Sequence, residues 1–180
     1  ERPFGVLVAG VGGGALGTPY RVGSNISIAR VSRLDDGRMN LVTIGGERFR
    51  LLDIRHDGPY LVGTAQPWPL SGESDSEAWG QVEPVRRHFR RYLDMLDEAE
   101  GHKISINTVP TDAHALALLV AIALQVSKPQ KQRLLEQATI PEMLASEQVI
   151  LKREHLLLDY VIRTQKEQWE GGFSGLLAAN

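Results

Sequence analysis

Cysteine is absent from the 180-residue sequence, which excludes disulfides, thiol catalysis and cysteine-ligated zinc. A chain without cysteine suits a reducing compartment, and we expect a cytoplasmic protein. Long hydrophobic runs are absent as well. The longest, ALALLVAIAL at residues 115–124, is shorter than the roughly 18 uncharged apolar residues of a membrane span and is typical of a buried helix. We therefore expect no membrane partner.

The chain also lacks a large net charge, because 20 Lys and Arg residues stand against 22 Asp and Glu residues. No overall positive field draws it to nucleic acid. The one basic cluster is RRHFRRY at residues 86–92. Phe89 and Tyr92 continue a helical apolar stripe with Val85 and Leu96, so the arginines are expected on the solvated face. Nucleic acid is not an expected partner, but arginines beside aromatics also suit RNA, which leaves an RNA-binding module as the alternative.

Catalytic motifs are missing too: the sequence has no GxxxxGK[ST] phosphate loop, no GxSxG nucleophile elbow and no HExxH pair. His155 and Asp159 stand four residues apart, a spacing that predicts a solvated ion pair on a helix in preference to a metal or catalytic site. His114 follows Asp112, and this pair indicates a helix start. We expect no catalytic residue, no metal and no cofactor.

A glycine-rich stretch after the first apolar run is the strongest hint of a cofactor. Gly10, Gly12 and Ala15 match the GxGxxG/A spacing of a dinucleotide-binding turn. That turn must lead directly into a helix, whose N-terminus binds the pyrophosphate, and the glycines and proline at residues 17–23 leave no room for one. We interpret the stretch as a loop between two strands. An enzyme that uses this loop for a small molecule is a second alternative.

The pattern divides the chain into a sheet half and a helical half. Apolar, β-branched runs alternate with turns up to about residue 64, and Asp36–Gly37 is a strong hairpin signal between two of them. A segment rich in Pro, Ser and acidic residues follows, and then the apolar period becomes helical. The expected division is a β subdomain at residues 1–66, a linker at residues 67–80 and a helical subdomain at residues 81–180.

The helical half shows four helical segments. One carries the stripe of Val85 and Leu96 and ends near Gly101. Two others cover residues 113–125 and 142–166. Between these lies a helix with Pro129 in its first turn, where a missing N–H costs nothing.

Two aromatic residues attract specific predictions. Phe49 and Leu51 alternate with Arg48 and Arg50, so Phe49 is expected in the core of the sheet with the arginines on the other face. Trp68 lies between two prolines in the linker. It is either a plug over the joint between the subdomains or an exposed anchor for a partner, and we favour the plug.

Several segments together resemble the N-terminal, substrate-recognising domain of the Lon ATP-dependent protease (protease La). Residues 22–66 resemble its sheet half, and residues 112–161 resemble its run of helices ending in a long one. The matching features of the sheet half are the VG at residues 22–23, the DG turn, a GxxRFR segment at residues 45–50 and PYL at residues 59–61.

This resemblance implies an α+β fold, in which a PUA-like antiparallel β-barrel or folded sheet is followed by a helical bundle. It implies a non-catalytic domain that binds unfolded or tagged polypeptides. The family's ATPase and Ser-Lys peptidase modules have no counterpart here, so we expect an isolated or stand-alone version of the domain. The family's proline-containing first strand is also missing, and since the chain starts with Glu1 we expect an N-terminal piece to be absent.

The resemblance also guides the expected binding residues and partners. Tyr20 and Arg21, at the end of the glycine loop, and Pro67 and Trp68, in the linker, are the candidate polypeptide-binding residues. Besides polypeptides, the expected partners are ATPase and peptidase modules or further copies of the chain. Because PUA-like sheets also bind RNA, the RNA-binding alternative stays open.

Overall fold

The computed structural model of the chain describes residues 4–9, 18–57, 60–72, 76–100, 106 and 108–177, and it leaves aside the side chains of residues 56–57 and 168–177. The chain forms two compact units, Glu1–Ser71 with Val126–Ala138, and Gly72–Gln125 with Thr139–Asn180. They are called the sheet unit and the helical unit below. The glycine-rich stretch at residues 10–17 lies outside the described residues.

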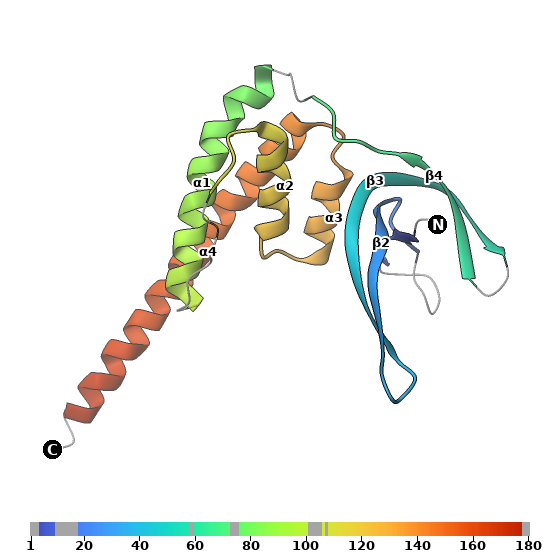
Figure 1. Ribbon diagram of the computed structural model, residues 1–180. Helices are drawn as coiled ribbons and strands as arrows, with labels where there is room; N and C mark the ends of the chain where they lie inside the picture. Colours follow the sequence, from blue (N-terminus) through green and yellow to red (C-terminus); the bar gives the residue numbers. More distant parts are fainter. Residues whose placement is uncertain are drawn as a thin grey trace. The chain divides into compact units, whose positions relative to one another are not determined.

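The sheet unit contains one four-stranded antiparallel sheet in the order β1-β2-β3-β4 (Figure 1). Each strand pairs with the next strand in the chain, an arrangement that short connections permit only between antiparallel strands. The two central strands are much longer than the outer two. The strands are β1 (Phe4–Val6), β2 (Val22–Arg33), β3 (Met39–Asp57) and β4 (Tyr60–Pro67).

The turn between β2 and β3 is the one that the Asp-Gly signal predicts. Leu34 N donates to Arg38 O at 2.9 Å, and Gly37 N donates to Leu34 O at 3.0 Å. Gly37 has a φ of 84°, a value that favours glycine. Asp36 accepts a hydrogen bond from Arg38 N at 3.0 Å and pairs with its guanidinium at 2.6 Å. The hairpin prediction is confirmed.

Phe49 packs in a way that two glycines make possible. A Cβ placed on Gly5 would lie 2.8 Å from Phe49 Cζ, and one placed on Gly23 would lie 3.1 Å from the same atom and would clash with Val6 O. The ring therefore covers bare backbone of β1 and β2. Phe49 is nevertheless only half-buried, so the prediction of a full core position was wrong, whereas Leu51 is 6% exposed.

A helix of the second half belongs to the sheet unit. α3 (Lys128–Glu136) contains Gln132, whose buried side chain donates to Val22 O at 3.0 Å. Arg48 of β3 donates to Leu135 O at 2.7 Å and Gln137 O at 2.9 Å, at the end of this helix where carbonyls lack helical partners. The compact units therefore differ from the expected division at residues 1–66, 67–80 and 81–180. Long-range contacts that no local pattern reveals are the reason.

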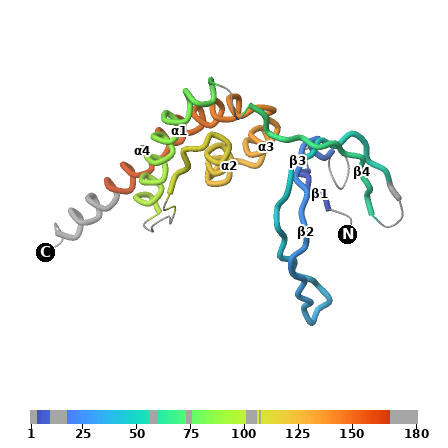
Figure 2. Tube along the Cα trace, turned by 45° about the horizontal axis from the view of Figure 1, so that its top comes forward, coloured from blue at the N-terminus to red at the C-terminus, as the bar shows by residue number. Residues whose placement is uncertain are grey.

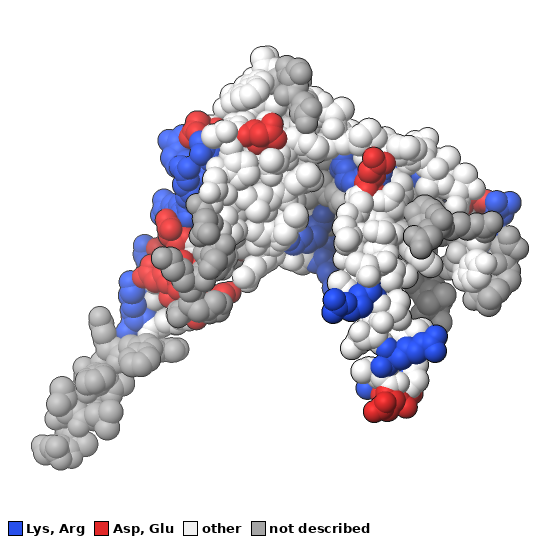
Figure 3. Space-filling model, viewed as in Figure 1, with Lys and Arg blue, Asp and Glu red and all other residues white. Residues whose placement is uncertain are grey.

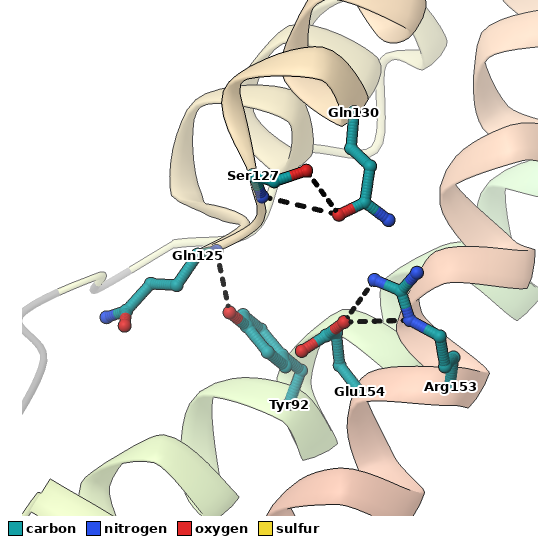
Figure 4. Close-up of polar contacts among 6 residues, drawn as sticks. All are labelled: Tyr92, Gln125, Ser127, Gln130, Arg153 and Glu154. Atoms are coloured by element: carbon teal, nitrogen blue, oxygen red, sulfur yellow. Dashed lines mark hydrogen bonds and ion pairs between the residues drawn. The ribbon is translucent and has the colours of Figure 1, made fainter.

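The start of α3 follows its sequence signals. Pro129 lies in its first turn, as predicted. Ser127 is the N-cap, and both its N–H and its hydroxyl lie within hydrogen-bond distance of Gln130 Oε1, at 3.3 Å and 3.0 Å (Figure 4). The contact from Ser127 N to Gln130 Oε1 satisfies a backbone donor that the helix itself leaves unpaired.

The helical unit contains α1 (Ser76–Glu100), α2 (Ala113–Ala123) and α4 (Ile140–Leu177). α1 and α4 run parallel, because contacts between them advance together along both helices, from His88 with His155 to Glu98 with Lys166. Tyr92 OH of α1 accepts a hydrogen bond from the Gln125 backbone N–H at 2.9 Å (Figure 4). The fold is α+β, as expected. The buried residues of α1 include five from the predicted apolar stripe, and Ala78 before it: Ala78, Val82, Val85, Phe89, Tyr92 and Leu96.

Two helices are longer than their signals indicate. α1 begins at Ser76 and continues through Pro84, whose missing N–H leaves Gly80 O without its usual helical donor. The packing of the helix outweighs this loss, so the last residues of the expected linker are helical. α4 extends to Leu177, beyond the expected end near Lys166.

Glu147 is the unusual group in the helical core. Its side chain is fully buried, and both carboxylate oxygens lack a hydrogen-bond partner among the described residues. Removal from water penalises the ionised form, which raises the pKa of Glu147 to about 9. The carboxyl is therefore neutral at physiological pH.

The contact between Phe49 and the glycines predicts the effect of adding one methyl group. Gly23→Ala should destabilise the sheet unit by about 1–3 kcal/mol, because the new Cβ meets Val6 O and lies 2.7 Å from Leu7 Cδ2. Gly45→Ala is the matched control, since nothing lies within 4 Å of its added Cβ. Amide hydrogen exchange in β1 and β2 measures the effect. Equal protection in the two variants would contradict the packing described.

The burial of Glu147 predicts a pH dependence for the helical unit. Between the ordinary glutamate pKa of 4.5 and about 9, the folded state holds a proton that the unfolded state has lost. Stability should thus be unaffected by Glu147 below pH 4.5 and fall as the pH rises toward 9, by up to about 1.4 kcal/mol per pH unit. Glu147→Gln should flatten this slope, and the exposed Glu167→Gln should not. Urea denaturation at pH 5, 7 and 9 tests this, and an unchanged slope in Glu147→Gln would contradict it.

Candidate functional site

The four residues predicted to bind polypeptide lie on the two sides of one stretch of β3. Tyr20 and Arg21 precede β2, and Arg21 O accepts a hydrogen bond from Leu51 N at 2.6 Å. Pro67 is paired with Phe49 at the end of β4, and Trp68 N donates to Arg48 O at 2.9 Å. The structure therefore brings both pairs to the central part of β3, on opposite edges.

The accessibility of these four residues differs. Arg21 and Pro67 are exposed, and the Arg21 guanidinium donates to Leu52 O at 3.1 Å. Tyr20 and Trp68 are half-buried. The Arg50 guanidinium lies 3.3 Å from the centroid of the Trp68 ring, so one face of the indole is covered from within the sheet unit. The interpretation of Trp68 as a plug at the joint between the subdomains stays a prediction.

A larger surface, which the sequence did not single out, is the outer part of the β2–β3 hairpin. We call residues 27–45 the hairpin arm. β1 pairs with β2 only as far as Ile26, and β4 pairs with β3 only from Phe49 onward. Among the described residues, no third strand flanks the arm, and in both views it extends beyond the short outer strands (Figure 1, Figure 2). No described strand therefore pairs with either edge of the arm, and its described side chains are exposed.

One face of the arm is mainly apolar. Side chains directly opposite each other in an antiparallel pair lie on the same face, and the register pairs Val31 with Leu41 and Arg33 with Met39. Four large apolar side chains share this face, and each is between 39% and 59% exposed: Ile28, Val31, Met39 and Leu41. Sequence alternation indicated strands here, but the same alternation fits a strand whose apolar face is buried. The sequence signal that could have identified the arm is the greater length of the runs that form β2 and β3, compared with the runs that form β1 and β4.

The basic cluster at residues 86–92 lies on α1. Phe89 and Tyr92 are 0% and 1% exposed, which confirms the predicted apolar stripe and leaves neither ring available to stack on a base. Arg87, Arg90 and Arg91 are exposed. Basic side chains follow one side of the helical unit (Figure 3).

His155 and Asp159 do not form the predicted pair. His155 Nε2 donates to His88 O at 2.9 Å, while Asp159 pairs with Arg163 at 2.8 Å, so the predicted ion pair between His155 and Asp159 was wrong. The reason is that His155 faces α1 and the core, where it is 8% exposed. Burial is the main cause of the lowered pKa of both His88 and His155, and their mutual proximity lowers that of His88 further.

Other sequence candidates have structural roles. Asp112 is the N-cap of α2 and accepts a hydrogen bond from Ala115 N at 2.7 Å, which confirms the predicted helix start. In the part of the chain that the structure describes, no three His, Asp or Glu side chains lie together as metal ligands would. None of the described helices is long and apolar enough to cross a membrane.

Solved structures share this fold. The N-terminal domain of the Mycobacterium avium complex Lon protease superposes with a TM-score of 0.62 at 21% identity, over 82% of this chain and 77% of that one. A Lon N-terminal domain protein from Xanthomonas campestris gives a TM-score of 0.52 at 21% identity, over 80% of this chain and 73% of that one. At these identities the likeness concerns the fold alone.

Curated relatives are whole proteases. Lon protease 1 of Hydrogenovibrio crunogenus is 24% identical over 125 residues, which are 69% of this chain and 15% of the relative. Lon protease 2 of Herpetosiphon aurantiacus is 27% identical over 155 residues, which are 83% of this chain and 18% of the relative. The chain thus spans less than a fifth of the length of these relatives.

The family model gives the decisive match. The model of the ATP-dependent protease La (LON) substrate-binding domain covers residues 2–153, which include the whole described sheet, α1, α2, α3 and the first part of α4. A match of this extent, in agreement with the fold, shows that the chain belongs to the family of Lon protease substrate-binding domains.

Proposed function

We propose that this chain is a non-catalytic recognition module that binds unfolded or tagged polypeptides. The observation that supports this most is the hairpin arm, where Ile28, Val31, Met39 and Leu41 expose apolar surface on one face. Contiguous exposed apolar surface is costly in water and is typical of interaction sites. Because the chain belongs to a family of substrate-binding domains, we propose that this surface binds polypeptide substrates.

The composition of the arm suits polypeptide better than RNA. Its turn carries Asp35 and Asp36, and Arg38 is paired with Asp36. These two acids offset two of the three arginines of the arm, Arg30, Arg33 and Arg38, so the arm has no strong positive field for phosphates. The aromatics of the basic cluster are buried in the helical core. An RNA-binding module therefore becomes an outcome to be tested.

The proposal includes the four candidate residues from the sequence, which would form the base of the binding site, next to the hairpin arm. Pro67 and Trp68 lie where β4 leaves β3, next to the start of the arm, and Tyr20 and Arg21 lie at the other edge of β3. Binding is expected to be weak, because ordering a flexible chain opposes association and a short surface recovers only part of that loss.

The remaining parts of the proposal concern the context of the chain. ATPase and peptidase modules or further copies of the chain are proposed partners, since the relatives are whole proteases and this chain covers less than a fifth of each. A cytoplasmic location rests on the absence of cysteine.

The apolar face of the arm predicts where binding is lost. Val31→Ser/Leu41→Ser should weaken binding of fluorescently labelled, carboxymethylated α-lactalbumin about tenfold, because two large apolar contacts disappear. The matched control is Val149→Ser/Leu156→Ser on α4, which removes side chains that are 70% and 74% exposed. Fluorescence anisotropy measures both variants. Equal weakening in the two would place the site elsewhere, and no binding by the wild type would overturn the proposed function.

The position of Trp68 at the base of the site predicts how two single substitutions differ in their effect on binding. Trp68→Ala should weaken binding of the same unfolded protein more than Arg87→Ala does, because Trp68 lies beside the arm and Arg87 on the helical unit. A single-stranded RNA is the competing probe, at low and moderate salt, since phosphate contacts weaken steeply with salt. Salt-sensitive RNA binding that Arg87→Ala removes, without any polypeptide binding, would favour the RNA module.

A further inference from the structure

The outer edge of β3 lacks the features that normally protect an edge strand. Natural sheets protect their edges with charged side chains, proline or covering segments. Residues 39–46, MNLVTIGG, contain neither a charge nor a proline, and no described strand covers them. The opposite edge of the arm differs, because β2 carries Arg30 and Arg33 there.

The backbone of this edge is arranged to accept a strand. Leu34 and Arg38 are hydrogen-bonded across the turn, and in an antiparallel pair the bonded positions alternate with positions whose N–H and C=O point outward. On β3, Asn40 and Val42 therefore bond to β2, while the backbone groups of Met39 and Leu41, before the register irregularity between Ile28 and Arg30, face the open edge. The side chains of these outward positions lie on the apolar face defined above.

We propose that the substrate is an extended, uncharged polypeptide segment that adds to this edge as a further strand along residues 39–46. This inference rests on the proposed function and specifies its ligand. The edge continues a ladder that already exists, because β4 pairs with β3 up to Phe49 and Trp68 N still donates to Arg48 O. Strand addition provides affinity through backbone hydrogen bonds and selects side chains at every second position.

The side-chain preference follows from the same geometry. Alternate residues of the added segment lie on the apolar face beside Met39 and Leu41, and these should be β-branched or otherwise apolar. No acidic or basic side chain on residues 39–46 is present to compensate a charge in the segment. The other face beside the edge carries the exposed side chains of Val42 and Ile44, so the alternate positions of the segment also meet apolar surface. The preferred ligand is thus an uncharged stretch rich in apolar and β-branched residues.

The first experiment tests the role of the peptide backbone with the full chain. The probe is an eight-residue peptide of alternating Val and Thr, acetylated, amidated and fluorescently labelled. Its counterpart has N-methyl groups on four consecutive central residues, which removes hydrogen-bond donors from both edges and keeps the side chains. Anisotropy should show at least about tenfold weaker binding of the methylated peptide, because several backbone bonds are lost.

The second experiment identifies the edge. Leu41→Pro removes an outward donor from β3, whereas Arg33→Pro removes an outward donor from the opposite edge of the arm, on β2. Binding of the unmethylated peptide should fall about five- to tenfold in Leu41→Pro and little in Arg33→Pro. Circular dichroism and hydrogen exchange in β4 check that both variants keep the sheet. If both prolines disturb the sheet, the methylated peptide alone decides.

The outcomes separate this inference from the proposed function. Binding of carboxymethylated α-lactalbumin that neither N-methylation of the peptide nor Leu41→Pro affects would overturn strand addition and leave the proposed function intact. Absence of binding to both the unfolded protein and the peptide would overturn both. A dimer seen by sedimentation that Leu41→Pro removes, without peptide binding, would show that the edge takes a second copy of the chain.

Discussion

The Arg48 guanidinium makes the long-range contact on which the sheet unit depends. It donates to two carbonyls, Leu135 O and Gln137 O, that the end of α3 leaves without helical partners. The backbone oxygen of the same residue accepts the hydrogen bond from Trp68 N. One residue of β3 thereby joins a helix 87 residues away to the sheet and marks the point where β4 leaves it. Burial lowers the pKa of Arg48, but a guanidinium remains charged throughout the physiological range.

This anchoring leaves the two ends of β3 with different surroundings. From Phe49 onward the strand is flanked by β4, and α3 packs near the start of β2, where Val22 is 3% exposed. Before that point β2 is the one described strand that pairs with β3. A two-stranded ribbon is marginally stable in water by itself, so the arm depends on the part of the sheet from which it extends. There, at an irregularity in β2, the side chain of Asn25 packs against Gly46.

The parts of the fold that follow from local chemistry could be predicted from the sequence. The Asp36–Gly37 turn, the Asp112 cap and Pro129 in the first turn of a helix each depend on a few adjacent residues. The division into units could not be predicted, because it depends on contacts such as that between Gln132 and Val22. The start of α1 at Ser76 was missed because the residues before the apolar stripe were assigned to a linker at residues 67–80. Tertiary packing extends the helix there, and it also outweighs the hydrogen bond lost at Pro84.

The candidate site could be predicted from the sequence only in part. Tyr20, Arg21, Pro67 and Trp68 were selected as residues near loops, and the structure places them along one part of β3. The hairpin arm escaped prediction, because apolar alternation is identical whether a strand is buried or not. What distinguishes the arm is that no described strand flanks it, and in the sequence the unequal lengths of the apolar runs are the signal for this.

The two edges of the arm differ in charge, and this asymmetry limits how strands can add to it. If both edges were free of charge, each added strand could be followed by another, which is the route to cross-β aggregation. Arg30 and Arg33 oppose pairing along β2, so addition is confined to β3. The captured segment then exposes an edge of its own, but the two arginines prevent the ribbon from growing in the other direction. A binding surface that is open on one side only can take up unfolded polypeptide and release it, because the backbone bonds it makes are few and each is individually weak.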